Sequence, residues 1–195
     1  MDQQAMRLDA LQEIVNIGGG NAATSLSQLI NKSVQMDIPT IEFMEYEKVY
    51  ETICSEDEQV RAILMKLLGQ EGVFLFVLSP DDAVKIADMV LPESVEASEE
   101  LVDSANKELV NILVNSFLNA LNKMLGVDLI ASVPVAAQDM FGSILSSVYI
   151  EQEQYDSQIF IIKNEFYSDG NKIEGALYFV PKPGVLEKLF ETLGL

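Results

Sequence analysis

Length, composition and charge exclude several classes of protein. The chain has 195 residues, of which 49% are hydrophobic, and a formal net charge of −19. Phosphate backbones and anionic membranes repel so acidic a chain, so we expect binding to neither nucleic acid nor membrane. The charge favours a partner with a basic patch, although a role in solubility alone explains it equally well.

The choice of reactive side chains is narrow, with no histidine and a single cysteine, Cys54. This excludes Ser-His-Asp and Cys-His triads, an internal disulfide and a thiolate zinc cage. The longest clean apolar run, residues 73–78, is too short to span a bilayer, and the N-terminus lacks the features of a signal peptide. We therefore expect a cytoplasmic protein whose chemistry uses carboxylates, amides, hydroxyls or groups of a partner.

The first half predicts a long helix, a strand, a hairpin and a shorter helix, from apolar periodicity and a Ser-Pro helix start. These elements are expected at residues 4–31, 34–38, 60–67 with 73–78, and 80–91. Pro39 closes the short strand, and residues 40–57 are ambiguous. The second half repeats this order after a linker-like stretch. Its elements are expected at residues 99–125, 129–133, 159–163 with 172–180, and 185–193.

Three consecutive glycines, Gly18 to Gly20, interrupt the apolar face of the first helix. Each costs about 0.5–1 kcal/mol relative to alanine inside a helix. We interpret the run as a close approach of another helix or backbone, with a local break of the helix as the other possibility. A phosphate cradle is disfavoured, because no strand precedes the glycines and no P-loop lysine follows them.

The two halves share a polar motif at a constant offset of 95 residues. Asp9, Glu13, Asn16 and Pro39 in the first half correspond to Ser104, Glu108, Asn111 and Pro134 in the second. Such an internal duplication predicts one pseudo-twofold domain over residues 1–195, made of repeats at about 1–97 and 98–195. The expected fold is α/β of the α+β type, with a mainly antiparallel sheet flanked by two long motif-bearing helices and smaller helices.

On a helix, the first three members of each motif lie on one face. A carboxylate beside a carboxamide is not a complete hydrolase site, because an amide is no general base and neither copy supplies a metal cage. It fits half a site, in which the amide orients a water and the carboxylate binds a cation of the partner. An aspartyl phosphate suits this arrangement, because phosphoryl transfer needs mainly positioning and charge stabilisation.

Structural explanations compete with this hypothesis. A single Glu and Asn pair on a helix is usually solvated surface, and duplication alone preserves residues without a function. Against that, Gly18 to Gly20 have become residues 113–115, Leu-Val-Asn, so nearby positions changed freely. Asn115, Asn119 and Asn122 extend the amide stripe, and we interpret them mainly as a solvated helix face.

The chain resembles the CheC-like family of chemotaxis phosphatases. The resemblance rests on QEIVNIGGGNAATSLSQLI, the second Glu and Asn pair, the two prolines and the terminal VPKPGVLEKLFETLGL, and it spans essentially the whole chain. It implies hydrolysis of the phosphoryl-aspartate of a CheY-type response regulator. It further implies that Asn16 and Asn111 orient the attacking water and that Glu13 and Glu108 bind the receiver's active-site lysine.

The other expectations from the resemblance concern support and partners. Asp9, Ser104, Pro39 and Pro134 support helix or interface geometry. The protein needs no cofactor or metal of its own, because Mg²⁺ belongs to the receiver. The deamidase CheD is a second partner, at a surface that the sequence does not place. Because both motifs lie in one chain, symmetry requires no dimer, and we expect a monomer.

Two other functions remain open at this point. The protein could be a non-enzymatic adaptor that sequesters the phosphorylated regulator or CheD, which predicts binding without faster phosphate loss. It could also be an independent metallohydrolase acting on small phosphate esters, an idea that the absence of histidine disfavours.

Overall fold

The computed structural model describes residues 3–31, 33–37, 39–52, 54–69, 72–92, 94–126, 128–152, 158–168, 171–181, 190–192 and 194. Its helices are α1 (Gln3–Ile30), α2 (Tyr46–Thr52), α3 (Pro80–Val90), α4 (Glu99–Leu125) and α5 (Phe141–Glu151). Its strands are β1 (Val34–Met36), β2 (Thr40–Glu45), β3 (Gln59–Leu68), β4 (Gly72–Leu78), β5 (Ile130–Ala131), β6 (Val135–Met140), β7 (Gln158–Ser168) and β8 (Asn171–Pro181).

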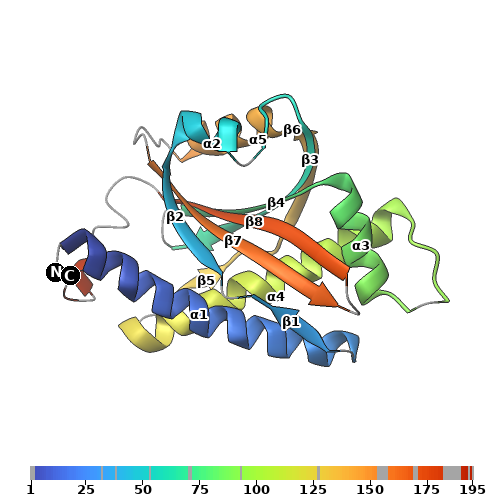
Figure 1. Ribbon diagram of the computed structural model, residues 1–195, viewed down its shortest axis with the longest axis horizontal. Coiled ribbons are helices and arrows are strands. Elements are labelled where there is room, and N and C mark those ends of the chain that lie inside the picture. The colour runs from blue at the N-terminus through green and yellow to red at the C-terminus, as the bar shows by residue number, and fades with distance from the viewer. Residues whose placement is uncertain are drawn as a thin grey trace.

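The elements form three layers with the sheet in the middle. The long helices α1 and α4 lie side by side on one face of the sheet, and α2 and α5 cover the other (Figure 1). Every strand pair recorded among the described residues is antiparallel. The expected fold class, a mainly antiparallel sheet flanked by two long helices, is therefore confirmed.

The strand order reads the same from both edges once equivalent strands are matched. The sheet runs β1-β7-β8-β4-β3-β5, with β2 also on β7 and β6 also on β3. If β1 to β4 correspond to β5 to β8, a twofold axis passes between the central strands β4 and β8. The division into repeats near residue 97 stays a prediction.

The central strand β4 shows how one sequence fills two cores. All of its residues from Gly72 to Leu78 are buried, because helices cover both faces of the sheet. Phe74, Phe76 and Leu78 belong to the core beneath α1 and α4, while Val73, Leu75 and Val77 belong to the core beneath α2 and α5. This alternation follows from the two-residue period of a strand.

Local signals set the bounds of the helices as expected. Ser79 caps α3 by accepting a hydrogen bond from the Asp82 amide, with Pro80 at the first helical position. Helix α4 ends at Gly126, whose φ of 67° is the left-handed conformation that glycine adopts at low cost. At the start of α4, Arg61 of β3 forms ion pairs with Glu99 at 3.0 Å and Asp103 at 2.6 Å.

Several elements differ in number or length from those expected along the chain. The ambiguous stretch 40–57 contains β2 and α2, and the corresponding part of the second half contains β6 and α5. The two hairpins are present but longer than predicted, and the second pairs from Phe160 with Phe179 to Ser168 with Asn171. The expected helix 185–193 lies mostly outside the described residues. Within the described ranges, no helix is long and apolar enough to cross a membrane.

Candidate functional site

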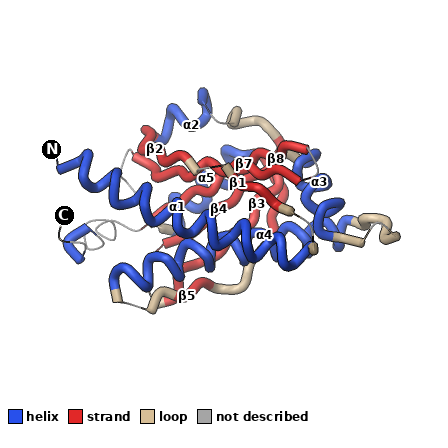
Figure 2. Tube along the Cα trace, turned by 60° about the horizontal axis from the view of Figure 1, so that its bottom comes forward, coloured by secondary structure: helices blue, strands red, loops and turns tan. Residues whose placement is uncertain are grey.

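The first motif lies on the outward face of α1. Asp9, Glu13 and Asn16 are all exposed, while Leu11 and Ile14, which lie on the opposite face, are buried against the sheet. Figure 2 shows α1 in front of the sheet, next to α4 along much of its length. The predicted arrangement, with polar side chains on one face of a continuous helix, is therefore present.

The glycine run fits α1 closely against its neighbours without breaking it. A Cβ at Gly18 would lie 3.0 Å from the Phe117 Cα of α4 and overlap the Phe117 ring, so α1 and α4 approach closely there. A Cβ at Gly19 would lie 3.2 Å from Cγ of Pro39, whereas one at Gly20 would meet no atom within 4 Å. The expected close approach is thus confirmed at Gly18, and the alternative of a broken helix is wrong.

Pro39 is joined to the motif through Gln12. The Gln12 Nε2 group donates to the carbonyl oxygen of Pro39 at 2.8 Å and to Oδ1 of Asn16 at 2.9 Å. The buried proline thus anchors a side chain that in turn holds the carboxamide of Asn16. Gln12 was not singled out in the sequence, because its contact with Pro39 joins positions 27 residues apart.

The second motif lies at the equivalent place on α4 but has a different neighbour. Ser104 and Glu108 are exposed, while Asn111 and Pro134 are half-buried. The Asn115 Nδ2 group donates to Oδ1 of Asn111 at 2.8 Å and to the Asn111 carbonyl oxygen at 2.8 Å. The interpretation of Asn115 as a solvated residue is therefore wrong.

Asn122 also has a structural partner, which corrects its assignment to the solvated face. Its Nδ2 donates to the Leu129 carbonyl oxygen at 3.1 Å, and its Oδ1 accepts from the Leu129 amide at 2.7 Å. On α1, Ser27 stands at the equivalent position, and its Oγ accepts from the Val34 amide at 3.0 Å. In both halves the long helix is thus joined to the segment that follows it. Asn119, in contrast, is exposed as expected.

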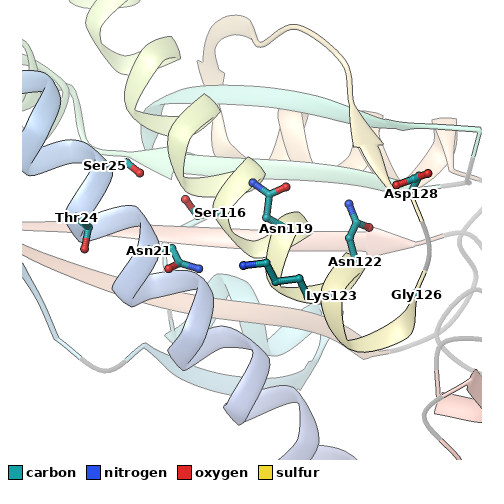
Figure 3. Close-up of a pocket in the computed structure, with 9 residues that line it drawn as sticks. All are labelled: Asn21, Thr24, Ser25, Ser116, Asn119, Asn122, Lys123, Gly126 and Asp128. Atoms are coloured by element: carbon teal, nitrogen blue, oxygen red, sulfur yellow. The ribbon is translucent and has the colours of Figure 1, made fainter.

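A polar groove of about 710 Å³ lies between α1 and α4. Figure 3 shows its amide and hydroxyl side chains projecting from both helices, together with the Lys123 ammonium and the Asp128 carboxylate. The lining residues are Asn21, Thr24, Ser25, Ser116, Asn119, Asn122, Lys123, Gly126 and Asp128. Glu13, Asn16, Glu108 and Asn111 are not among them. Glu13, Asn16 and Glu108 are exposed and Asn111 is half-buried, so a protein partner could cover the motif side chains.

The remaining groups to consider are metal-binding side chains and the single thiol. No group of three or more His, Cys, Asp or Glu side chains within the described residues is placed to hold a metal ion. Cys54 is a free, half-buried thiol, whose pKa is raised to about 12 by burial and by the neighbouring Glu58 carboxylate. A protonated thiol is a poor nucleophile at neutral pH. The chemistry open to the motifs is hydrogen bonding by the amide and cation binding by the carboxylate.

Comparison with known proteins shows that the chain is similar to CheC-like proteins. The model of the CheC-like family matches residues 6–42, which include α1, the first motif and Pro39. The chain is 25% identical over 198 residues to the CheY-P phosphatase CheC of Bacillus subtilis, across 96% of this chain and 94% of that protein. The resemblance expected from the sequence is thereby confirmed.

Two further relatives extend the comparison to flagellar proteins. The chain is 28% identical over 125 residues to the flagellar motor switch phosphatase FliY of B. subtilis. The aligned region covers 64% of this chain and 31% of that protein. The crystal structure of Thermotoga maritima FliY matches with a TM-score of 0.74 and 22% identity, across 97% of this chain and 96% of that one. This structural match establishes the shared fold.

Proposed function

We propose that the protein is a phosphatase that hydrolyses the aspartyl phosphate of a CheY-type response regulator. The observation that carries the proposal is the duplicated motif, in which a glutamate and a hydrogen-bonded asparagine stand on the outward face of each long helix. The relative that is similar over nearly the whole chain is named a CheY-P phosphatase. The relative that is similar over the larger part of the chain is named a flagellar motor switch phosphatase.

In the proposed reaction, the receiver docks on α1 or α4 and brings the phosphoryl group with its Mg²⁺. The carboxamide of Asn16 or Asn111 hydrogen-bonds the attacking water. The water oxygen forms a bond to phosphorus while the bond from phosphorus to the aspartyl oxygen breaks. The leaving carboxylate takes the electron pair, and the proton of the water passes to the released phosphate or to solvent.

The glutamates would fix the orientation of the receiver. Glu13 and Glu108 are exposed carboxylates, each three residues before the asparagine and therefore on the same helix face. A lysine of the receiver could form an ion pair with either one as its active site closes over the helix. Pairing of this kind contributes to orientation and association rate as well as to affinity. Asp9 and Ser104 lie one turn earlier and would contact the rim of the same interface.

The test is phosphate release from a phosphorylated CheY-type receiver with and without this protein. We expect Asn16→Ala and Asn111→Ala each to remove most of the activity of its own site, on the order of 10²–10³-fold, as for the loss of a preorganised hydrogen-bond group. The double variant should retain almost none, and Asn119→Ala is the matched amide control. Unchanged release by the double variant would refute the role of the asparagines in orienting water.

The same assay separates the adaptor hypothesis. An adaptor would bind the phosphorylated receiver, detected by calorimetry, without accelerating phosphate release. We also propose, from the resemblance, that the deamidase CheD is a second partner and, from the presence of both motifs in one chain, that the protein is a monomer. Calorimetry with purified CheD and sedimentation equilibrium would test these two expectations directly.

A further inference from the structure

The oxygen of each motif asparagine already accepts a hydrogen bond from another amide on its own helix. On α1 the donor is Gln12, four residues before Asn16, and on α4 it is Asn115, four residues after Asn111. Both donors are also bound to a backbone carbonyl, of Pro39 in one case and of Asn111 in the other. In each donor, the same amide nitrogen that binds the asparagine oxygen is thus fixed by its second hydrogen bond, to a backbone carbonyl.

We propose that Gln12 and Asn115 are positioning residues that set which end of the adjacent carboxamide faces a docked substrate. This inference rests on the proposed phosphatase function, and it adds two residues that do not belong to the duplicated motif. Neither would touch the phosphoryl group, because each acts through the side chain of Asn16 or Asn111.

The physical reason lies in the carboxamide itself. The last side-chain torsion of asparagine is broad and roughly twofold, so an exposed asparagine exchanges its oxygen and nitrogen ends readily. A donor fixed beside the oxygen favours one of these two states. The oxygen has two acceptor sites, so one stays available for a water while both N–H groups point elsewhere. Preorganisation of this kind removes a cost that would otherwise fall in the transition state.

The two supports are not equivalent under the 95-residue offset. Lys107 stands at the position of Gln12 in the second half, and Gly20 stands at the position of Asn115 in the first. Each half thus has one amide support, on opposite sides of its asparagine. A side chain added at Gly20 would meet no atom within 4 Å of its Cβ, so α1 has room for the support that α4 uses.

The first experiment reverses the hydrogen bond to the asparagine, and removes the bond to the backbone carbonyl, without changing the shape of the side chain. Gln12→Glu is made in an Asn111→Ala background, so that only the α1 site acts, and Asn115→Asp in an Asn16→Ala background. The new carboxylate only accepts, so it binds the nitrogen end of the asparagine and turns the carboxamide over. We expect kcat for phosphate release to fall roughly 5- to 30-fold with KM changed less than about twofold, as for one lost hydrogen bond.

Charge-matched controls are available on the same helices. Gln28→Glu on α1 and Asn119→Asp on α4 introduce the same charge at exposed positions outside the motifs. If these controls lower kcat as much as Gln12→Glu and Asn115→Asp, the effect is one of charge and the inference is overturned. A change in KM alone would also overturn it, because positioning acts on the reaction step.

The second experiment transfers the α4 support to α1. In the Asn111→Ala background, Gln12→Leu removes the donor and should lower kcat about 5-fold. Adding Gly20→Asn should restore most of that loss by supplying a donor four residues after Asn16. If the role of Gln12 were purely structural, a donor on the other side of Asn16 would not restore kcat. Failure of Gly20→Asn to restore kcat in a folded variant therefore contradicts the proposal.

A third measurement does not depend on activity. The side-chain amide signals of Asn16, resolved by ¹⁵N NMR, should shift with Gln12→Leu and stay in place with Gln28→Leu. If the wild-type protein does not accelerate phosphate release, the proposed function fails, while these spectra still decide whether Gln12 holds Asn16. Signals of Asn16 that ignore Gln12→Leu would overturn the positioning role even in an active phosphatase.

Discussion

On α1 the amide oxygen of Asn16 accepts its hydrogen bond from a residue one turn earlier, whereas on α4 that of Asn111 accepts from a residue one turn later. The presented pairs, Glu13 with Asn16 and Glu108 with Asn111, are the same in both halves. Only the supporting side chain has moved. The comparison indicates that the exposed glutamate and asparagine are more tightly constrained than the side chain that supports the asparagine.

The same relation holds away from the motifs. Ser27 joins α1 to the amide of Val34, and Asn122 joins α4 to the amide of Leu129, at equivalent positions with different residues. Where the helices cross, Gly18 faces Phe117, while the equivalent positions carry Leu113 and Ala22, all in one core. In both pairs the small residue lies on α1 and the large residue on α4, and the helices approach closely at Gly18 and Phe117.

Among the variants that compare the two halves, the largest effect is expected at the two glutamates. Glu13→Lys and Glu108→Lys, each measured with the other site inactivated, place a positive charge where the receiver lysine should dock. We expect kcat/KM to fall on the order of 10²-fold in each case. Glu47→Lys on α2, across the sheet, controls for the overall change in charge. A large loss in only one half would show that the halves engage the receiver differently.

The contact between the helices is tested next, through stability. Gly18→Ala should lower the free energy of unfolding by about 1–3 kcal/mol, because the new methyl group overlaps Phe117 in a packed core. The measurement is urea unfolding followed by circular dichroism. Adding Phe117→Leu should recover part of the loss, since neighbouring residues couple. If the two substitutions were strictly additive, the paired small and large residues would not explain the close approach.

The joins between helix and strand should give smaller, unequal effects. Asn122→Ala removes two hydrogen bonds with Leu129 and should cost about 1–2 kcal/mol, while Ser27→Ala should cost about 1 kcal/mol. Asn119→Ala and Ser25→Ala are exposed neighbours that should change stability by less than about 0.5 kcal/mol. If substitutions at the exposed positions lowered the free energy of unfolding as much as those at Asn122 and Ser27, these hydrogen bonds would not stabilise the protein.

The smallest expected effect is a gain. Gly20→Ala should stabilise the protein by about 0.5–1 kcal/mol, because alanine is a better helix former and its Cβ would meet no atom within 4 Å. Thermal unfolding of Gly20→Ala beside Gly18→Ala measures the difference between two glycines two residues apart. A loss at Gly20 would mean that α1 is packed there more tightly than the structure indicates.

The long helices and the hairpins could be predicted because their patterns are strong. Helical spacing, caps and continuous apolar runs mark α1, α3, α4 and the strands of the central sheet. The unexpected strands β2 and β6 lie at the edges of the sheet, and none of their residues is buried. An edge strand needs neither a continuous apolar run nor a clean alternation, so its sequence resembles that of a loop.

The placement of the motif on exposed helix faces could also be predicted, because repetition at a fixed offset is visible in the sequence. Its catalytic roles stay predictions. The supports could not be found in that way, because Lys107 and Gly20 occupy the equivalents of Gln12 and Asn115. Such contacts depend on side-chain placement and on the chain returning to Pro39, which a search for repeated residues does not detect.

The pairing of strands between the two halves has a consequence for how the chain folds during synthesis. Val34 of β1 pairs with Ser168 of β7, which is 134 positions later, and β3 pairs with β6 of the other half. The first edge of the sheet therefore has no partner until most of the chain has left the ribosome. Pairings at such sequence separation close slowly and leave strands uncovered meanwhile, so folding should take milliseconds to seconds and benefit from a chaperone.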